Sequence, residues 1–476
     1  MKKVFILLLA VVALLAFSIP AMALHGVKEM LDYTPSTVKA KSAQVTLSGD
    51  WRVRGSYCEN CSDFQDETAG SFDDDAAAYD HRVRLGVMAT VSPNTFGVLQ
   101  LENDSLGSDG FTWGAVQAGG GTYNQSGNAK PTDMHIRQSY ISHQGTALTG
   151  MLSGFKVGHM LIALGTGTYY NHTKGGDDTI LFWVQPNDDT EIAFAIIKGD
   201  ENSSSGTGIN SDDTDIYAIT LETKAGGAAI SADVSRLHDD TTFNQGTGVD
   251  ANLDLWNLGL RVGLDLSGVG VNVGCDIQSG EIENYKTSGN ATLDLSGYQC
   301  QIKADTMVGD VNVHAGFAYG SGDDIDSTDD YEGFITSLSS GGNIGTFVYD
   351  NTLATAGQTP SATGVSSTWN NANTQGLANT WYLNVGATTN VTPDVAVNAE
   401  LFFLNASEKV SNTAELDDET VGVELDGKVT YQIDTALAWY VETGILFADD
   451  FYKNVTGAGV SPDSAWRVRQ GVTLSF

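Results

Sequence analysis

The residues best suited to chemistry in this sequence are arginines that stand two positions apart. Side chains with this spacing lie on the same face of a β-strand, and a guanidinium group keeps its charge and binds carboxylates and phosphates. Three Arg-x-Arg motifs and one single arginine contain seven of the nine arginines: Arg52, Arg54, Arg82, Arg84, Arg467, Arg469 and Arg137. Gathered on one surface, they predict an environment that attracts anions.

A second group of charged residues is acidic, and the same spacing places it on the corresponding face of later strands: Glu400, Glu424, Asp426 and Glu442. If both groups line one pore, a basic wall lies beside an acidic wall and a transverse field crosses the space between them. Such a field orients dipolar solutes and selects ions. The alternative, which stays open, is a solvated wall of ion-paired ladders without solute preference.

The strands that must position these charges show period-two alternation. In residues 45–57 the odd positions are apolar or glycine and the even positions are polar or charged, and residues 419–431 repeat the arrangement. Both runs are longer than the five or six residues that are usual in soluble strands. One face of each strand is therefore oily and the other is wet.

About eighteen such runs follow one another, with sixteen as the alternative count. They lie near residues 44–57, 79–92, 95–103, 131–143, 151–164, 178–185, 190–199, 213–223, 228–237, 252–266, 269–280, 291–304, 309–320, 378–390, 394–404, 419–431, 434–447 and 465–476. Short turns, at 92–94, 186–188, 224–227, 267–268 and 391–393, alternate with long, polar, acidic connections.

This rhythm is typical of a transmembrane antiparallel β-barrel with short periplasmic turns and long extracellular loops. Lipid offers no hydrogen-bond partners to the backbone, so a spanning sheet must close on itself. We therefore predict an all-β barrel surrounded by outer-membrane lipid. The last run ends in Phe476 and resembles the C-terminal signature by which the barrel assembly machinery recognises bacterial outer-membrane barrels.

The N-terminus has the order of charge, apolar core and small residues that defines a secretory signal peptide: Lys2 and Lys3, then Val4 to Phe17, then Ala21-Met22-Ala23. We expect a signal peptide at 1–23, a periplasmic segment at 24–43 and a barrel at 44–476. The formal net charge of −35 argues against nucleic acid as a partner.

Four cysteines are too few to form the main framework of an exported protein of this length. Cys58 and Cys61 form a C-x-x-C motif without the following histidine of a haem site and without two further zinc ligands, which leaves a local disulfide or free thiols. Cys275 and Cys300 flank a hairpin loop and both face outward by parity, so we predict a disulfide between them.

The longest connection, residues 321–377, exceeds a simple loop tip. Its acidic start, 321–330, offers oxygen atoms to calcium but lacks the spacing of an EF-hand, which favours a solvated loop and no metal. Long connections of this kind are usually functional. We predict that this one forms a constriction or lid.

Several stretches resemble the porins related to alginate exporters, which are single-chain barrels of Gram-negative outer membranes. They are Leu47–Gly55, Asp80–Gly86, Ile136–Ile141 and Thr420–Asp426, and they are spread over most of the chain. The resemblance implies an eighteen-stranded barrel whose lumen carries arginines for an anionic substrate.

These features predict a porin for passive or weakly selective diffusion of small hydrophilic or anionic solutes, with no cofactor. The alternatives are a barrel that sheathes a periplasmic or extracellular partner, or a surface adhesin. No nucleophile and base arrangement points to an enzyme. The solute, and the choice between monomer and trimer, stay open.

Overall fold

The computed structural model describes most of the barrel region. It covers residues 36–40, 43–61, 64, 76–103, 111–112, 134–165, 167–173, 175–202, 212–239, 252–283, 292–324, 330–336, 344–350, 376–410, 418–456 and 460–476. The predicted signal peptide lies outside the described residues. The predicted segment 24–43 is described only at 36–40 and at residue 43.

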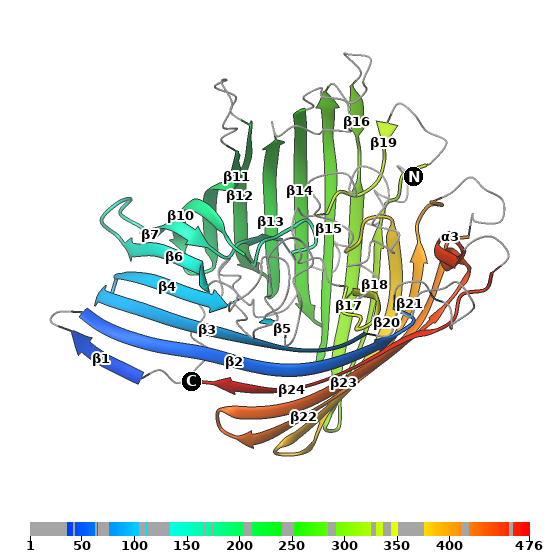
Figure 1. Ribbon diagram of the computed structural model, residues 1–476. Coiled ribbons are helices and arrows are strands. Elements are labelled where there is room, and N and C mark those ends of the chain that lie inside the picture. The colour runs from blue at the N-terminus through cyan, green and yellow to red at the C-terminus, as the bar shows by residue number, and fades with distance from the viewer. Residues whose placement is uncertain are drawn as a thin grey trace, which may run out of the picture.

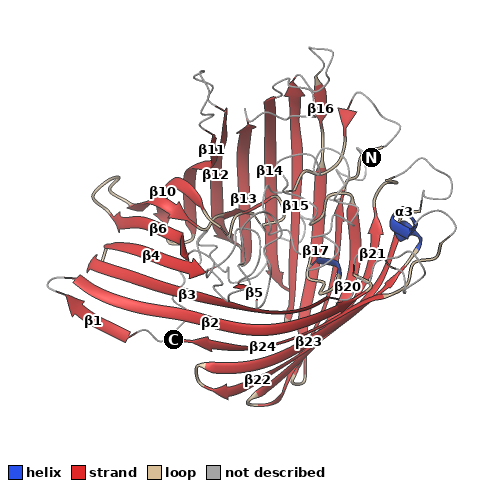
Figure 2. Ribbon diagram, viewed as in Figure 1, coloured by secondary structure: helices blue, strands red, loops and turns tan. Residues whose placement is uncertain are grey.

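Eighteen antiparallel strands form a closed barrel (Figures 1 and 2). In chain order they are β2 (Ala43–Glu59), β3 (Ala76–Ser92), β4 (Thr95–Asn103), β6 (Met134–Gly145), β7 (Leu152–Met160), β10 (Asp177–Asn187), β11 (Thr190–Asn202), β12 (Asp212–Ala225), β13 (Ala228–Asp239), β14 (Asn252–Asp265), β15 (Val269–Glu283), β17 (Tyr298–Val308), β18 (Val311–Gly320), β20 (Thr380–Thr392), β21 (Val395–Ala406), β22 (Thr420–Asp434), β23 (Leu437–Ala448) and β24 (Ala465–Ser475).

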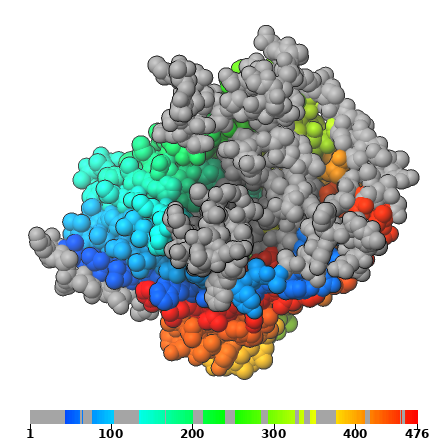
Figure 3. Space-filling view, viewed as in Figure 1, coloured from blue at the N-terminus to red at the C-terminus, as the bar shows by residue number. Residues whose placement is uncertain are grey.

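The barrel closes where its first strand pairs with its last. β2 and β24 pair antiparallel from Asp50 opposite Ser475 to Glu59 opposite Trp466, and these two strands, blue and red, lie side by side on the surface (Figure 3). The closure leaves no open edge between β2 and β24, as a sheet in lipid requires.

Eight shorter elements are described in addition to the eighteen barrel strands. They are β1 (Ser36–Ala40), β5 (Phe111–Thr112), β8 (Ala163–Leu164), β9 (Tyr170–Asn171), β16 (Leu293–Leu295), β19 (Asp330–Tyr331), η3 (Asp450–Tyr452) and α3 (Lys453–Thr456). β1 extends the pairing of β2 beyond the end of β24. Among the described residues, no helix has the length and apolar character needed to cross a membrane.

The outer face of the barrel is apolar and the inner face is polar. Trp51 and Val53 are 51% and 42% exposed, whereas Asp50 and Arg54, on the opposite face of the same strand, are 5% and 9% exposed. Large apolar side chains remain exposed on nearly every strand of the outer face, including Ile141, Ile219 and Leu258. An apolar surface of this extent suits lipid rather than water.

The strand predictions are confirmed in number, but one run is wrong in its bounds. Residues 291–304 were expected to form a single strand, whereas the structure has two, β16 and β17, which pair with β15 in one register, and β17 continues to Val308. The break falls at Ser296 and Gly297, where a Cβ on Gly297 would meet the carbonyl oxygen of Gly333 at 2.6 Å. The chain stays in the wall at this break, because the Gly297 oxygen still accepts from the Gln278 amide at 2.7 Å, while the neighbouring loop packs against it.

Segments of the connections fold onto the inner face and bury two apolar clusters. The first inner cluster joins the loop residues Leu164, Tyr169, Tyr170 and Phe334 to inward side chains of β11–β15. The second joins Ile344, Val348 and Tyr349 of the long loop to inward side chains of β18–β24. The lumen is therefore narrowed from two sides by the chain itself.

Candidate pore-lining site

The arginines of the basic sector lie on the inner faces of neighbouring strands. The basic sector comprises Arg52, Arg54, Arg82, Arg84, Arg137, Arg467 and Arg469. They come from β24, β2, β3 and β6, which follow one another around the seam with β4 between β3 and β6. Their even or odd position matches the polar face of each strand, as the sequence predicted.

Carboxylates pair with these arginines across adjacent strands. Arg54 Nε lies 2.6 Å from Asp80 Oδ2, and Arg52 shares the same carboxylate at 3.9 Å. Arg82 lies 2.8 Å from Asp50. Neither Asp50 nor Asp80 was among the predicted site residues, although the even positions of both place them on the polar face of β2 and β3.

Glu102 of β4 is the most deeply placed of these carboxylates. It lies 2.6 Å from Arg84 and 3.0 Å from Arg137, and its side chain is 1% exposed. Arg137 also donates to Gln100 at 2.8 Å and to the backbone oxygen of Thr173 at 2.5 Å. Arg137 thus links the wall to the inward loop that follows β7.

The two arginines of β24 meet the long loop. The guanidinium groups of Arg467 and Arg469 lie 5.3 and 5.0 Å from the centre of the Phe347 ring, within the range of a cation–π contact. Arg469 also pairs with Glu442 at 3.3 Å. Among the described residues, the carboxylates that pair with arginines of the basic sector are Asp50, Asp80, Glu102 and Glu442.

The acidic sector comprises Glu400, Glu424, Asp426 and Glu442, and it lies beside the basic sector on β21–β23. Glu400 accepts from His314 Nε2 at 2.7 Å. Glu442 lies 3.1 Å from Lys428 and is 15% exposed. These two carboxylates keep some contact with solvent.

The prediction that Glu424 and Asp426 line the open pore needs correction. Both face inward, but the backbone of the long loop covers them. Glu424 accepts from the amides of Phe347, Val348 and Tyr349 at 2.7, 2.6 and 3.0 Å, and it is 0% exposed. Asp426 accepts from the Phe347 amide at 3.0 Å. Parity gives the face of a side chain and does not reveal a loop that lies on it.

The loop segment 344–350 is itself closed by hydrogen bonds. Asp350 Oδ2 accepts from the amides of Gly345 and Thr346 at 2.8 and 3.0 Å, and Asp350 donates its own amide to Thr346 Oγ1 at 3.1 Å. Burial raises the pKa of the Asp350 carboxyl to about 7.

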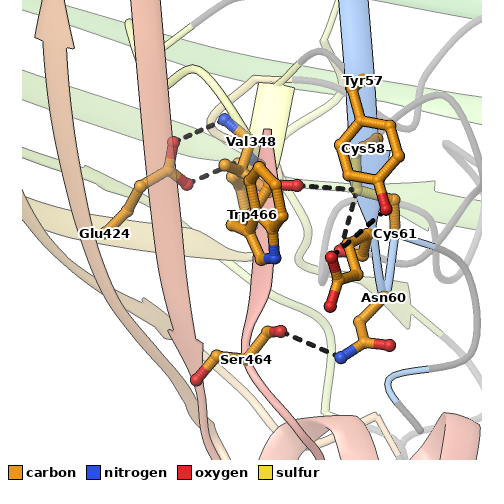
Figure 4. The surroundings of a disulfide bond; sticks show 10 residues. Tyr57, Cys58, Asn60, Cys61, Val348, Glu424, Ser464 and Trp466 are labelled. Carbon is orange, nitrogen blue, oxygen red and sulfur yellow. Dashed lines mark hydrogen bonds between the residues drawn. A yellow bond between two sulfur atoms is a disulfide. The ribbon is translucent and has the colours of Figure 1, made fainter. Parts of the chain in front are cut away.

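A disulfide joins Cys58 to Cys61 at the end of β2, close to this segment (Figure 4). The turn is held by Asn60, whose side-chain amide donates to the Ser464 oxygen at 3.2 Å. A second disulfide joins Cys275 to Cys300, which stand directly opposite each other on β15 and β17. Its residues are those for which the sequence predicted a bridge.

Phe476 lies at the seam. Its backbone exchanges two hydrogen bonds with Gly49, at 2.8 and 3.0 Å. Its ring covers Gly49, where a Cβ would lie 2.4 Å from the ring. Phe476 thus contacts the first strand, β2, through both its backbone and its ring.

Metal-binding clusters of His, Cys, Asp and Glu are absent from the described residues. Of the acidic stretch 321–330, only 321–324 and residue 330 are described. There Asp323 accepts from the Glu332 amide at 2.9 Å, so one of its carboxylate oxygens already serves the loop backbone.

Comparison with known proteins identifies the fold. No family model matches the sequence, and no curated protein matches it. Among solved structures, the chain is similar to Pseudomonas aeruginosa OccK2 in complex with glucuronate (9% identity, 91% of this chain and 96% of that chain, TM-score 0.50). It is also similar to OpdK of the same organism with vanillate (9%, 90% and 98%, 0.50). A third match is OccAB1 of Acinetobacter baumannii (12%, 90% and 97%, 0.50). The chain thus has the eighteen-stranded fold of Gram-negative outer-membrane porins.

Proposed function

We propose that this protein is a porin of a Gram-negative outer membrane, through which small hydrophilic or anionic solutes diffuse passively or with weak selectivity. The observation that carries the proposal is the barrel wall itself, apolar outside and lined inside by the basic sector. A pore of this kind needs no catalytic residue or cofactor, because the charged wall alone biases which solutes enter.

Two features of similar proteins and of this chain support the proposal. The matched Pseudomonas structures contain glucuronate and vanillate, which are small carboxylates that arginines bind well. The inner face is partly filled by the chain's own loop segments, which leaves little room for a sheathed partner and so favours the pore over the sheath.

The proposal extends to how the protein is exported, inserted and narrowed. We infer export by the signal peptide at 1–23, and insertion by the assembly machinery through Phe476. The strand motifs resemble those of porins related to alginate exporters, and that resemblance implies an anionic substrate. The loop segments docked on the inner face favour small solutes over large ones. We infer that the long loop forms the constriction through its described segment 344–350.

Swelling of liposomes that contain the folded protein tests the function. We expect glucuronate to enter faster than glucose, which is uncharged and of similar size. Replacing Arg52, Arg54, Arg82 and Arg84 by glutamine should reduce this preference severalfold, because the basic wall loses four charges.

Arg236→Gln provides the matched control, because Arg236 pairs with Asp254 on the outer face and is 40% exposed. Folding of each variant is checked by its heat-dependent gel mobility. Liposomes that do not swell in either solute would refute the pore. An unchanged preference in the folded fourfold variant would show that the basic sector does not govern transport.

A further inference from the structure

Lys303 and Asp305 carry opposite charges on the inner face of β17, and both side chains are exposed. Among the described residues, neither of them forms an ion pair. Arg54 and Arg137 of the basic sector, by contrast, are paired and are 9% and 5% exposed. We propose that Lys303 and Asp305 form a binding site for a small zwitterion, whose carboxylate binds Lys303 and whose ammonium group binds Asp305. This inference rests on the proposed function.

Glycines on the two neighbouring strands give these side chains room to lean apart. Asp305 stands opposite Gly270 of β15, where a Cβ would lie 2.8 Å from Asp305 Oδ1. Lys303 stands opposite Gly316 of β18, where a Cβ would lie 3.4 Å from Lys303 Cγ. The two side chains therefore lie over different strands, and neither charge neutralises the other.

The ionisable neighbours of this pair are bound to each other. His314 of β18 stands directly opposite Asp305, but its Nε2 lies 2.7 and 2.8 Å from the two carboxylate oxygens of Glu400. Glu400 is 15% exposed. Asp305 accepts one long hydrogen bond, from Asn312 at 3.4 Å. A carboxylate can accept about four hydrogen bonds, so Asp305 keeps acceptor capacity for a solute.

The pair lies where a solute arrives after it has passed the docked segment 344–350. Phe402 of β21 packs in the second inner cluster with this segment. Lys303 and Phe402 belong to one cross-strand row, which runs over β17, β18, β20 and β21. The row of Asp305 follows on the side of the periplasmic turn. A solute that enters from outside therefore meets Lys303 first and Asp305 next.

Two opposite charges without ion-pair partners favour one class of solute. An anion is attracted by Lys303 but repelled by Asp305, and a cation meets the reverse. A zwitterion binds both groups through charge-assisted hydrogen bonds. Alternate residues of a strand lie about 7 Å apart, and each hydrogen bond spans about 3 Å. This spacing suits a solute that has a few atoms between its two charges.

Block of the KCl current through single channels tests the site. The probe is γ-aminobutyrate, a zwitterion, and the comparison is γ-hydroxybutyrate, an anion of nearly the same size. We expect γ-aminobutyrate to half-block the wild-type channel at a severalfold lower concentration. Lys303→Gln should weaken block by both solutes, because both lose the partner of their carboxylate. Asp305→Asn should weaken block by γ-aminobutyrate alone.

Lys224→Gln and Asp310→Asn are the matched controls, because each removes one charge at a periplasmic turn, near the end of β12 and between β17 and β18. Both should keep the wild-type block, and heat-dependent gel mobility checks the folding of every variant. Equal block of the wild type by the two solutes, or unchanged block by γ-aminobutyrate in either folded site variant, would overturn the inference while the pore stands. A wild-type protein that forms no channel would overturn both proposals.

Discussion

The basic and acidic sectors of the inner wall satisfy their charges in different ways. Arginines of the basic sector pair with carboxylates of adjacent strands, such as Arg84 with Glu102 at 2.6 Å. Carboxylates at the centre of the acidic sector pair with backbone amides of a distant loop, such as Glu424 with Val348 at 2.6 Å. Strand pairing brings the arginines of the basic sector next to their carboxylates, whereas a docked loop supplies the partners of the central acidic residues. The ion pairs of the basic sector should therefore stabilise the barrel, and the hydrogen bonds of the acidic sector should stabilise the docked loop.

The largest effect on stability is expected at Glu102. Glu102→Ala removes a buried carboxylate shared by Arg84 and Arg137, and losing one partner of a buried ion pair typically costs ~3–5 kcal/mol. Urea unfolding in lipid vesicles measures the loss. Glu442→Ala is the comparison, because Glu442 is 15% exposed, and it should cost less. Equal losses would remove the distinction between deep and shallow pairs.

Glu424→Ala should have the opposite profile. We expect the unfolding free energy of the barrel to change by less than ~1 kcal/mol, because no strand partner of Glu424 is lost. Docking of 344–350 should weaken strongly, since each hydrogen bond to a charged group contributes ~1.5–3 kcal/mol. Faster hydrogen exchange of the Phe347 and Val348 amides detects this. Barrel unfolding as severe as in Glu102→Ala would contradict the contrast between the two sectors.

A smaller effect is expected from pH through Asp350. Its pKa is raised from an ordinary value of 3.8 to about 7 by burial in the docked loop, where Glu424 and Asp426 of β22, Tyr382 of β20 and Tyr452 of η3 face the same cluster. The arginines of β24 lie on its far side, around Phe347.

The docked state holds the Asp350 proton in a pH range where the released state does not. Docking is therefore strongest below about pH 4, weakens as the pH rises from about 4 to 7, and is constant above 7. Conductance should rise over the same range and then level off. Asp350→Asn should flatten this response. A rise that persists unchanged in Asp350→Asn would assign the pH dependence to another group.

Local alternation was enough to predict how each strand faces, because a strand has only two faces and the lipid requires one of them to be apolar. Arg52, Arg137 and Arg469 lie on the polar face of their strands for this reason. Asp80 follows the same rule, although it was not among the predicted site residues. The cover over Glu424 was not predictable, because it depends on a contact between residues about 75 positions apart that leaves no period in the sequence.

The break between β16 and β17 also arises from a contact between residues that are distant in the sequence. Residues 291–304 alternate well enough for one strand, yet Gly297 packs against Gly333 of the following connection. Where the wall meets only lipid and its own neighbours, the sequence predicts the structure. Where an inward loop meets the wall, tertiary contacts decide the outcome.

The reversal potential of the wild-type channel across a KCl gradient tests the central claim most directly. The inner wall near the seam carries the seven arginines of the basic sector, and the long loop covers Glu424 and Asp426, so we predict preference for chloride over potassium in a protein whose net charge is −35. Preference for potassium would contradict the account, because the acidic chain as a whole, and not the basic sector, would then control passage.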